Sequence, residues 1–228
     1  MSRFQTTRWS LIAAAATEAP ARARPALEQL CLAYYPPVLA YIRHCGHRDA
    51  EDLAQAFFLH LLERDWCTRA NPARGRFRAL MLASLRNFLA DHDDRARTRW
   101  HLAAPAGDEQ ASRLPDRDGP EQAFTRAWLA VLLERAVNRL QREWQQAGRQ
   151  LEFDRIGPLL LLEEADQGEL KALARAWGLR ANTLAVRVHR MRTRLRQLAR
   201  LELLQTVDSQ ETLEAELADL RGAIGASP

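Results

Sequence analysis

Lysine is almost absent from this sequence of 228 residues: Lys171 is the only one among 33 basic residues. The remaining basic side chains are arginines, whose planar guanidinium with its five donors suits phosphates and base edges. A GC-rich genome that encodes arginine wherever lysine would serve explains the same composition. Because the net charge is only +4, the clustering of the arginines along the chain is the better test.

Cysteine is scarce as well, and Cys31, Cys45 and Cys67 form an odd count without close pairs. This count favours free thiols over a disulfide framework. The first residues lack the basic start and apolar core of a signal peptide, and no apolar run approaches the roughly 18 residues that a membrane helix needs. We therefore expect a protein of the reducing cytoplasm that has no contact with membranes.

The sequence also lacks a recognisable catalytic constellation. It has no glycine-rich phosphate loop, and Ser10 and Ser84 have no partnered base within a known motif. His44, Cys45 and His47 lie close together in the sequence, but their spacing matches no zinc-ligand pattern. We expect no enzymatic activity, no metal and no cofactor.

Glycine and proline, with ten of each, are sparse, and alanine, leucine and arginine outnumber the β-branched residues. These preferences favour helix nearly everywhere. Residues 101–120 differ, because they are rich in Ala, Gly, Pro and Asp without periodicity, as is typical of a linker. We predict an all-α fold of two small helical domains joined by this flexible linker, plus a C-terminal helix. The expected parts are an N-terminal extension (1–25), a first domain (26–100), the linker (101–120), a second domain (121–204) and a C-terminal extension (205–228).

The strongest functional pattern in the sequence is a helix-turn-helix over residues 169–196. Ala174 is small, as a residue must be where two helices cross closely, and Gly178 follows four residues later, where a left-handed turn favours glycine. Leu184 and Val188 then supply the inner face of a second helix. This spacing is typical of a motif whose second helix enters the major groove of DNA.

The outer face of that second helix is polar and basic. Six arginines fall between positions 187 and 200 without one acid among them. Residues at the helix N-terminus would meet base edges, and the later arginines would meet phosphates. A solvated amphipathic face is the alternative, but solubility alone does not require so many arginines. The residues of this face are Asn182, Thr183, Arg187, Arg190 and Arg194, continued by Arg192, Arg196 and Arg200.

Four motifs, in this order, resemble those of the extracytoplasmic-function (ECF) sigma factors, a branch of the sigma-70 family of bacterial RNA polymerase. Residues 51–55 (EDLAQ) are similar to region 2.2, and residues 75–78 (GRFR) followed by 85–87 (LRN) are similar to regions 2.3 and 2.4. The helix-turn-helix ending at residues 188–192 resembles region 4. Residues 7–12 (TRWSLI) resemble a subgroup with extended N- and C-termini.

The resemblance implies a docking face for polymerase in the first domain. Asp49, Glu51, Asp52 and Gln55 would bind the coiled coil of the β′ subunit, where carboxylates suit a basic partner and the glutamine adds a directional hydrogen bond. Compensation of the helix dipole is the alternative. It would explain Asp49 and Glu51 but not a polar stripe that reaches Gln55.

The resemblance also implies a site for the melted −10 element. A base flipped out of the duplex needs compensating hydrogen bonds and stacking, since its extrusion costs a few kcal/mol. Without the resemblance, residues 74–76 would be interpreted as an ordinary exposed turn. The lining residues would be Asn71, Arg74, Arg76 and Phe77, with Arg86, Asn87 and Asp91 beside the separated strands.

Region 4 would recognise the −35 element through the start of its second helix. Family members often have serine at the position of Arg180, where it caps this helix. Arginine cannot cap in that way, so we expect Asn182 to do so, which would use up its side chain. The residues implied for the −35 element are Arg180, Asn182, Thr183, Arg187, Arg190 and Arg194.

The leading hypothesis is a sigma factor that binds core RNA polymerase, recognises the −10 and −35 elements of promoter DNA and directs transcription initiation without chemistry of its own. The alternative is a stand-alone helix-turn-helix regulator with a helical sensor or dimerisation domain. A protein-binding adaptor is a third class, which the basic helix disfavours. Whether an anti-sigma factor or another regulator binds the chain stays open.

The C-terminal stretch 206–224 is acidic, with Glu211, Glu214, Glu216 and Asp219. It could fold over the basic helix of region 4 and mask it. It could equally be a solvated end or a site for a partner.

Overall fold

The computed structural model describes residues 20–63, 76–103, 119–160, 167–207 and 209–225. All regular structure in these ranges is helical and none is strand, which confirms the all-α fold. None of the helices over the described residues has the length and apolarity that crossing a membrane requires. The elements are α2 (Pro20–His44), α3 (Ala50–Glu63), α5 (Phe77–Ala103), α6 (Pro120–Gln146), α7 (Gln150–Ile156), the 3-10 helix η2 (Gly157–Leu160), α8 (Gln167–Ala176), α9 (Ala181–Leu204) and α10 (Gln210–Gly225).

The chain divides into two compact units. Among the described residues, the first unit contains α2, α3, α5, the start of α6 up to Val131, and everything from Leu204 onward, including α10. The second unit runs from Leu132 to Leu203. The division therefore falls inside α6 and inside α9, and the C-terminal residues belong with the N-terminal helices. The expected linker lies largely in residues 104–118, outside the described residues.

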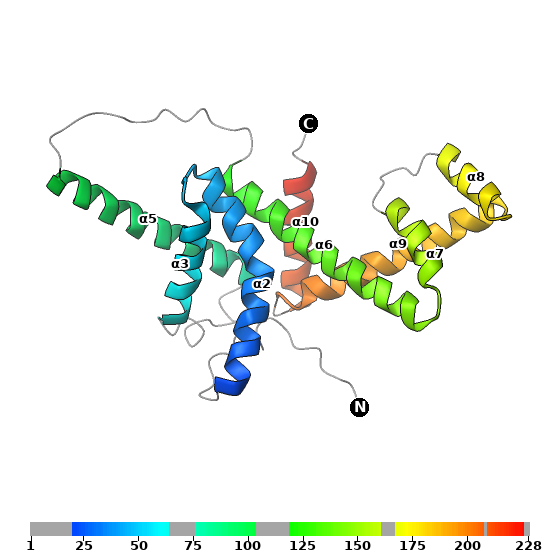
Figure 1. Cartoon of the computed structure of the whole chain (residues 1–228), viewed down its shortest axis with the longest axis horizontal. Helices are drawn as coiled ribbons and strands as arrows, with labels where there is room; N and C mark the ends of the chain where they lie inside the picture. Colours follow the sequence, from blue (N-terminus) through cyan, green and yellow to red (C-terminus); the bar gives the residue numbers. More distant parts are fainter. Residues whose placement is uncertain (1–19, 64–75, 104–118, 161–166, 208, 226–228) are drawn as a thin grey trace. The chain divides into compact units, whose positions relative to one another are not determined.

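The core of the first unit is built around fully buried aromatic rings. Phe57 of α3 lies between Leu53 and Leu61 at helical spacing, and this stripe faces inward while α3 packs on α2. Figure 1 shows the two helices as neighbours. Tyr34 of α2 meets Phe77 of α5 edge to face, with ring centroids 4.9 Å apart. Aromatic pairs favour this geometry, which joins α5 to the same core.

The C-terminal helix α10 is an integral part of the first unit. Ser209 caps its start, because the Ser209 hydroxyl accepts a hydrogen bond from the amide of Thr212 at 3.1 Å. Leu213 and Leu220 are buried on its inner face, and full burial of a leucine side chain contributes on the order of 2 kcal/mol. The amide of Phe77 also donates to the carbonyl of Thr206 at 3.3 Å. The residues just before α10 are thus tied to the start of α5.

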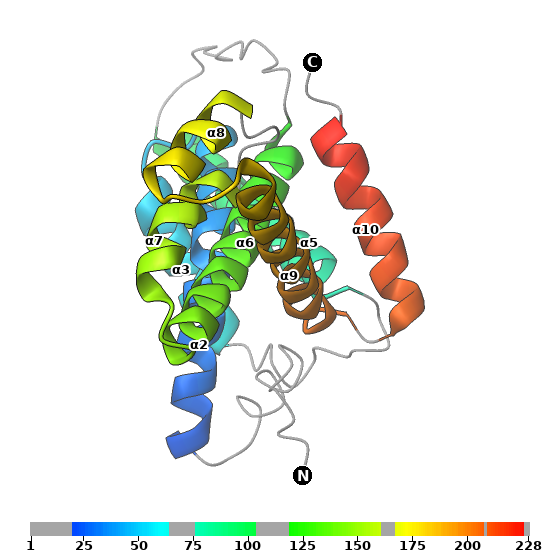
Figure 2. The same ribbon diagram turned by 90° about the vertical axis from the view of Figure 1, so that its right-hand side faces the viewer.

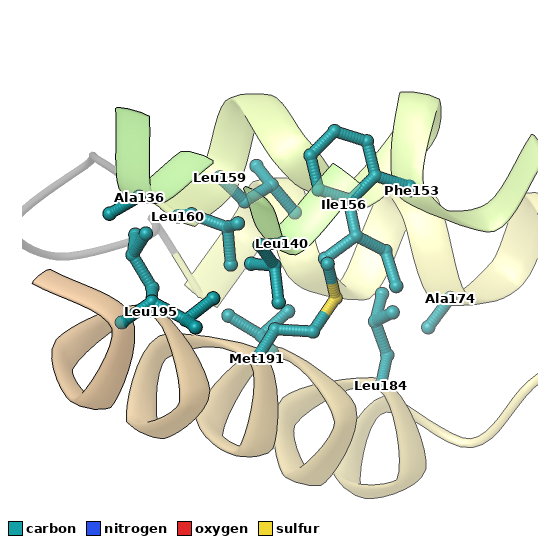
Figure 3. Packing of buried hydrophobic residues seen from close by; sticks show 12 residues of the cluster. Ala136, Leu140, Phe153, Ile156, Leu159, Leu160, Ala174, Leu184, Met191 and Leu195 are labelled. Carbon is teal, nitrogen blue, oxygen red and sulfur yellow. The ribbon is translucent and has the colours of Figure 1, made fainter. Parts of the chain in front are cut away.

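The second unit is a helix-turn-helix packed against α6, α7 and η2. Figure 2 shows α8 followed by the turn into α9. Gly178 adopts φ 63° in this turn, and the amide of Leu179 reaches back to the carbonyl of Ala174 at 2.9 Å. Ala174 is buried near Leu184, as Figure 3 shows. The small residue, the left-handed glycine and the inner leucine expected from the sequence therefore lie in the expected relation.

Candidate nucleic-acid interface

The outer face of α9 presents most of the residues that the sequence assigns to the −35 element. Leu184 and Val188 are buried and hold one side of the helix against the core, where Figure 3 shows Leu184. Arg187 is half-buried. The exposed members of the set are Arg180, Asn182, Thr183, Arg190 and Arg194.

The main chain of Arg180, and not Asn182, provides the N-cap of α9. The carbonyl of Arg180 accepts hydrogen bonds from the amides of Thr183 at 2.9 Å and Leu184 at 3.2 Å. Asn182 lies within the first turn, and its side chain is exposed. The expectation that Asn182 caps the helix is therefore wrong, because the helix begins at Ala181, one residue before that position. The Asn182 side chain stays at the surface of α9.

Arg187 lies against the neighbouring helix α7. Its Nη1 donates to Oε1 of Glu152 at 2.9 Å, while Arg149 donates to the other carboxylate oxygen at 2.7 Å. Beside this pair is an open cavity of about 350 Å³. The described hydrogen bond uses only Nη1 of Arg187, and the side chain is 37 % exposed. The cavity is lined by Leu151, Glu152, Arg155, Trp177, Leu179 and Arg187.

Arg194 forms a two-pronged ion pair with Glu143 of α6. Its Nε donates to Oε2 at 2.9 Å and its Nη2 to Oε1 at 2.8 Å. The hydrogen bond from Arg194 holds the pKa of Glu143 below its usual value, and the same bond raises the pKa of Arg194. Arg192 donates to the carbonyl of Leu159 at 2.7 Å, which ties α9 to η2. The basic helix thus combines arginines that hold the fold with exposed ones.

At the start of α5, Arg76 of the expected −10 site and Arg78 two residues later face two carboxylates of α10. Nη1 of Arg76 donates to Oε2 of Glu216 at 2.6 Å and also to Asp219. Nε of Arg78 donates to Oε1 of Glu216 at 2.5 Å. Both oxygens of the buried Glu216 are therefore used. The hydrogen bond to Asp219 is the main cause that raises the pKa of Arg76.

Arg78 also contacts α6. Its Nη1 donates to the hydroxyl of Thr125 at 3.0 Å, and its guanidinium carbon lies 5.5 Å from the ring centroid of Trp128. Thr125 and Trp128 are both buried. A guanidinium over an aromatic face adds a cation–π attraction to the hydrogen bonds. Arg78 therefore joins three helices of the first unit.

The remaining expected −10 residues fall into three groups. Phe77 is fully buried against Tyr34, so the expectation that it stacks on a flipped base is wrong: its ring is part of the core. Asn71 and Arg74 lie outside the described residues. The residues that are exposed along α5 are Arg86, Asn87 and Asp91.

The expected polymerase-docking residues share the exposed side of α3 and its N-terminus. The carbonyl of Asp49 accepts from the amide of Leu53 at 2.9 Å, which places Asp49 at the N-cap. Glu51 pairs with Arg43 of α2, and this hydrogen bond is the main reason that the pKa of Glu51 lies below its usual value. Asp52 and Gln55 are exposed together with them.

The cluster of Cys31, Cys45 and the histidines nearby does not assemble into a metal site. Among the described residues, no three His, Cys, Asp or Glu side chains are grouped closely enough to hold an ion. Burial raises the pKa of the Cys31 thiol.

The sequence did not lead to Glu216, Asp219 or Thr125 as members of the candidate site. One local signal was present: Glu216 lies three residues after Leu213 and four before Leu220, on the apolar stripe of its helix. A carboxylate in that position needs a cation to be buried. The identity of the cations is a matter of tertiary structure.

No protein-family model, curated protein or solved structure matches the chain.

Proposed function

We propose that this protein is a sigma factor of the ECF type, which binds core RNA polymerase in the cytoplasm and directs initiation at promoters. The observation that carries the proposal is that one chain presents two polar faces that differ in charge. A basic face lies on α9 of the second unit, and an acidic and amide face lies on α3 of the first. On each helix, the residues on the other side are apolar and buried.

The α9 face suits the −35 element. Asn182 and Thr183 are exposed in the first turn, where a recognition helix brings short polar side chains to base edges. Arg190 is exposed one to two turns later and suits a phosphate. Arg187 and Arg194 would exchange their carboxylate partners for phosphates on binding.

The α3 face suits a basic partner surface, and we assign it to the β′ coiled coil. Asp52 and Gln55 lie three residues apart on the helix and are both exposed, so one partner can contact both. Asp49 and Glu51 extend the same acidic region. Dipole compensation alone accounts for acids in the first turn but not for Gln55.

The α5 face suits a melted −10 strand. Arg86 is exposed, and its ion pair to Glu121 is long, at 3.6 Å, so it can turn to a phosphate. Asn87 and Asp91 lie one turn apart on the same helix and are exposed, and their side chains can hydrogen-bond to base edges. The protein itself performs no chemistry in this proposal, since phosphodiester formation belongs to the polymerase.

The test is transcription in vitro with purified bacterial core polymerase, this protein and a fragmented genomic template, followed by sequencing of RNA 5′ ends. The proposal predicts defined start sites preceded by a shared pair of sequence elements, which disappear when the protein is omitted. Tight duplex binding without polymerase, on a two-fold site, together with no transcripts, would instead favour the stand-alone regulator.

A further inference from the structure

The C-terminal helix α10 binds Arg76 and Arg78, at the start of α5, through the buried carboxylate of Glu216. The side chain of Glu216 is only 1 % exposed, and those of Arg78 and Arg76 are 13 % and 29 % exposed. Asp219 lies at the rim of the cluster and is 53 % exposed. The partners are 138 to 143 residues apart in the sequence. The contact thus joins the end of the chain to the first unit.

The cluster is electrically balanced, with two guanidinium groups against two carboxylates. A carboxylate as deeply buried as Glu216 is stable only while charged donors surround it. Docking of α10 and occupation of Arg76 and Arg78 are therefore one event. If α10 leaves, both guanidiniums lose their anionic partners and become available to another anion.

Arg76 is one of the residues that the resemblance implies for the melted −10 strand, and Arg78 ends the GRFR motif (75–78) that is similar to regions 2.3 and 2.4. The donors that now face Glu216 and Asp219 are the same donors that would face phosphate oxygens. One oxyanion can replace another without leaving a guanidinium unpaired. A single strand and α10 cannot occupy these donors together.

We propose that α10 is an autoinhibitory helix whose carboxylates, Glu216 and Asp219, occupy the Arg76–Arg78 pair in place of the nucleic-acid backbone. This rests on the proposed function, because it places Arg76, and with it the motif that contains Arg78, at single-stranded promoter DNA. Release of α10 opens the site. The ion pairs described for α10 go to Arg76 and Arg78 at the start of α5, so the proposal concerns the −10 surface.

The competing reading is a permanent clamp, in which Arg76 and Arg78 only hold α10 in place. The two readings differ in the effect of removing the carboxylates. An autoinhibitory helix then frees a binding site, and affinity for a single strand increases. A permanent clamp then loses structure, and affinity stays the same or decreases.

The test measures binding of a fluorescent single-stranded oligonucleotide to the full chain by anisotropy, without polymerase. The double variant Glu216→Gln with Asp219→Asn is compared with Glu211→Gln with Glu214→Gln, which removes the same charge from exposed positions of the same helix. We expect the first to bind about tenfold more tightly than wild type, a typical coupling between competing ligands. The control should change affinity by less than about twofold, since it alters only long-range charge.

An equal change in the two double variants, or weaker binding by the first, would overturn the proposal. Circular dichroism shows whether the first variant folds. If it does not, Asp219→Asn alone gives the answer: it removes only the exposed rim contact, and tighter binding supports autoinhibition while unchanged or weaker binding overturns it. Core-polymerase binding by wild type, measured separately, tests the proposed function. Normal core binding without a change in single-strand affinity rejects the autoinhibitory helix alone.

Discussion

The two units both pair arginines with carboxylates, but the carboxylates differ in how deeply they are buried. In both, an arginine expected at DNA faces a carboxylate of its own chain: Arg76, together with Arg78, faces Glu216 in the first unit, and Arg194 faces Glu143 in the second. The difference is the burial of the acid. Glu216 is 1 % exposed, whereas Glu143 is 34 % exposed.

This difference separates a contact that holds a helix from one that merely orients a side chain. An exposed ion pair contributes little to stability, typically about 0 to 1 kcal/mol, and exchanges easily for phosphate. A buried pair is different, because removing one partner leaves an uncompensated charge in the interior. The ion pair of Arg194 is therefore exchanged more easily for another anion than the contacts of Arg76 and Arg78 with the buried Glu216.

The largest effect should follow from Glu216→Ala. It leaves Arg76 and Arg78 without their shared buried partner, so we expect the free energy of unfolding of the first unit to fall by about 3 kcal/mol. Urea titration followed by circular dichroism measures this. Glu211→Ala, an exposed acid of the same helix, should change stability by less than about 0.5 kcal/mol. Equal losses of unfolding free energy in the two variants would show that the buried Glu216 contributes no more than an exposed acid, which would contradict the comparison.

A smaller effect is expected from Asn182→Ala in the second unit. Because Asn182 is exposed and does not cap α9, its loss should leave stability unchanged but weaken binding to the preferred −35 sequence by about 1–3 kcal/mol. Arg190→Ala should instead weaken binding to all sequences and lower the salt slope by about 1. Competition binding with a panel of duplexes separates the two. A uniform loss with Asn182→Ala would show that it reads no base.

The turn between α8 and α9 should tolerate substitution poorly. Gly178 adopts φ 63°, and nothing lies within 4 Å of an added Cβ, so the cost of Gly178→Ala is backbone strain alone. We expect a loss of about 1 kcal/mol in the stability of the second unit. Gly178→Asn should recover part of it, since asparagine enters the left-handed region more easily. Thermal unfolding measures both, and an equal cost for Ala and Asn would contradict the assignment.

The smallest effect concerns the exposed pair of Arg194 and Glu143. Because the hydrogen bond lowers the pKa of Glu143 in the folded state, the contribution of the pair is present above the usual glutamate pKa. It is lost as pH falls through the lowered value. We expect Glu143→Gln to remove a shallow decline in thermal stability below about pH 4.5. An unchanged decline in the variant would assign it to other carboxylates.

Local patterns predicted the parts of the fold that depend on near neighbours. The stripe of Leu53, Phe57 and Leu61 and the turn at Gly178 were visible in the sequence, because spacing and backbone conformation determine both. The exposure of Asp52 and Gln55 followed from the same stripe. The polar faces of α3 and α9 could therefore be predicted before any tertiary contact was known.

The parts that could not be predicted depend on contacts between distant segments. The burial of Phe77 results from packing on Tyr34, and the partners of Glu216 lie more than a hundred residues away. Neither leaves a periodic signal of its own. Arg76 and Phe77 were both expected to line the −10 site, but the structure places Phe77 in the core and Arg76 in an ion-pair cluster.

The most direct test of the central claim is the affinity for core RNA polymerase, measured with a fluorescent label on this protein. We predict that wild type binds core enzyme and that Asp52→Arg with Gln55→Ala weakens binding by at least about tenfold, because it reverses the charge at the docking face. Glu134→Arg, an exposed acid on α6, serves as the charge-matched control and should leave the affinity near that of wild type. Absence of core binding by wild type, or equal binding by all three proteins, would contradict the account.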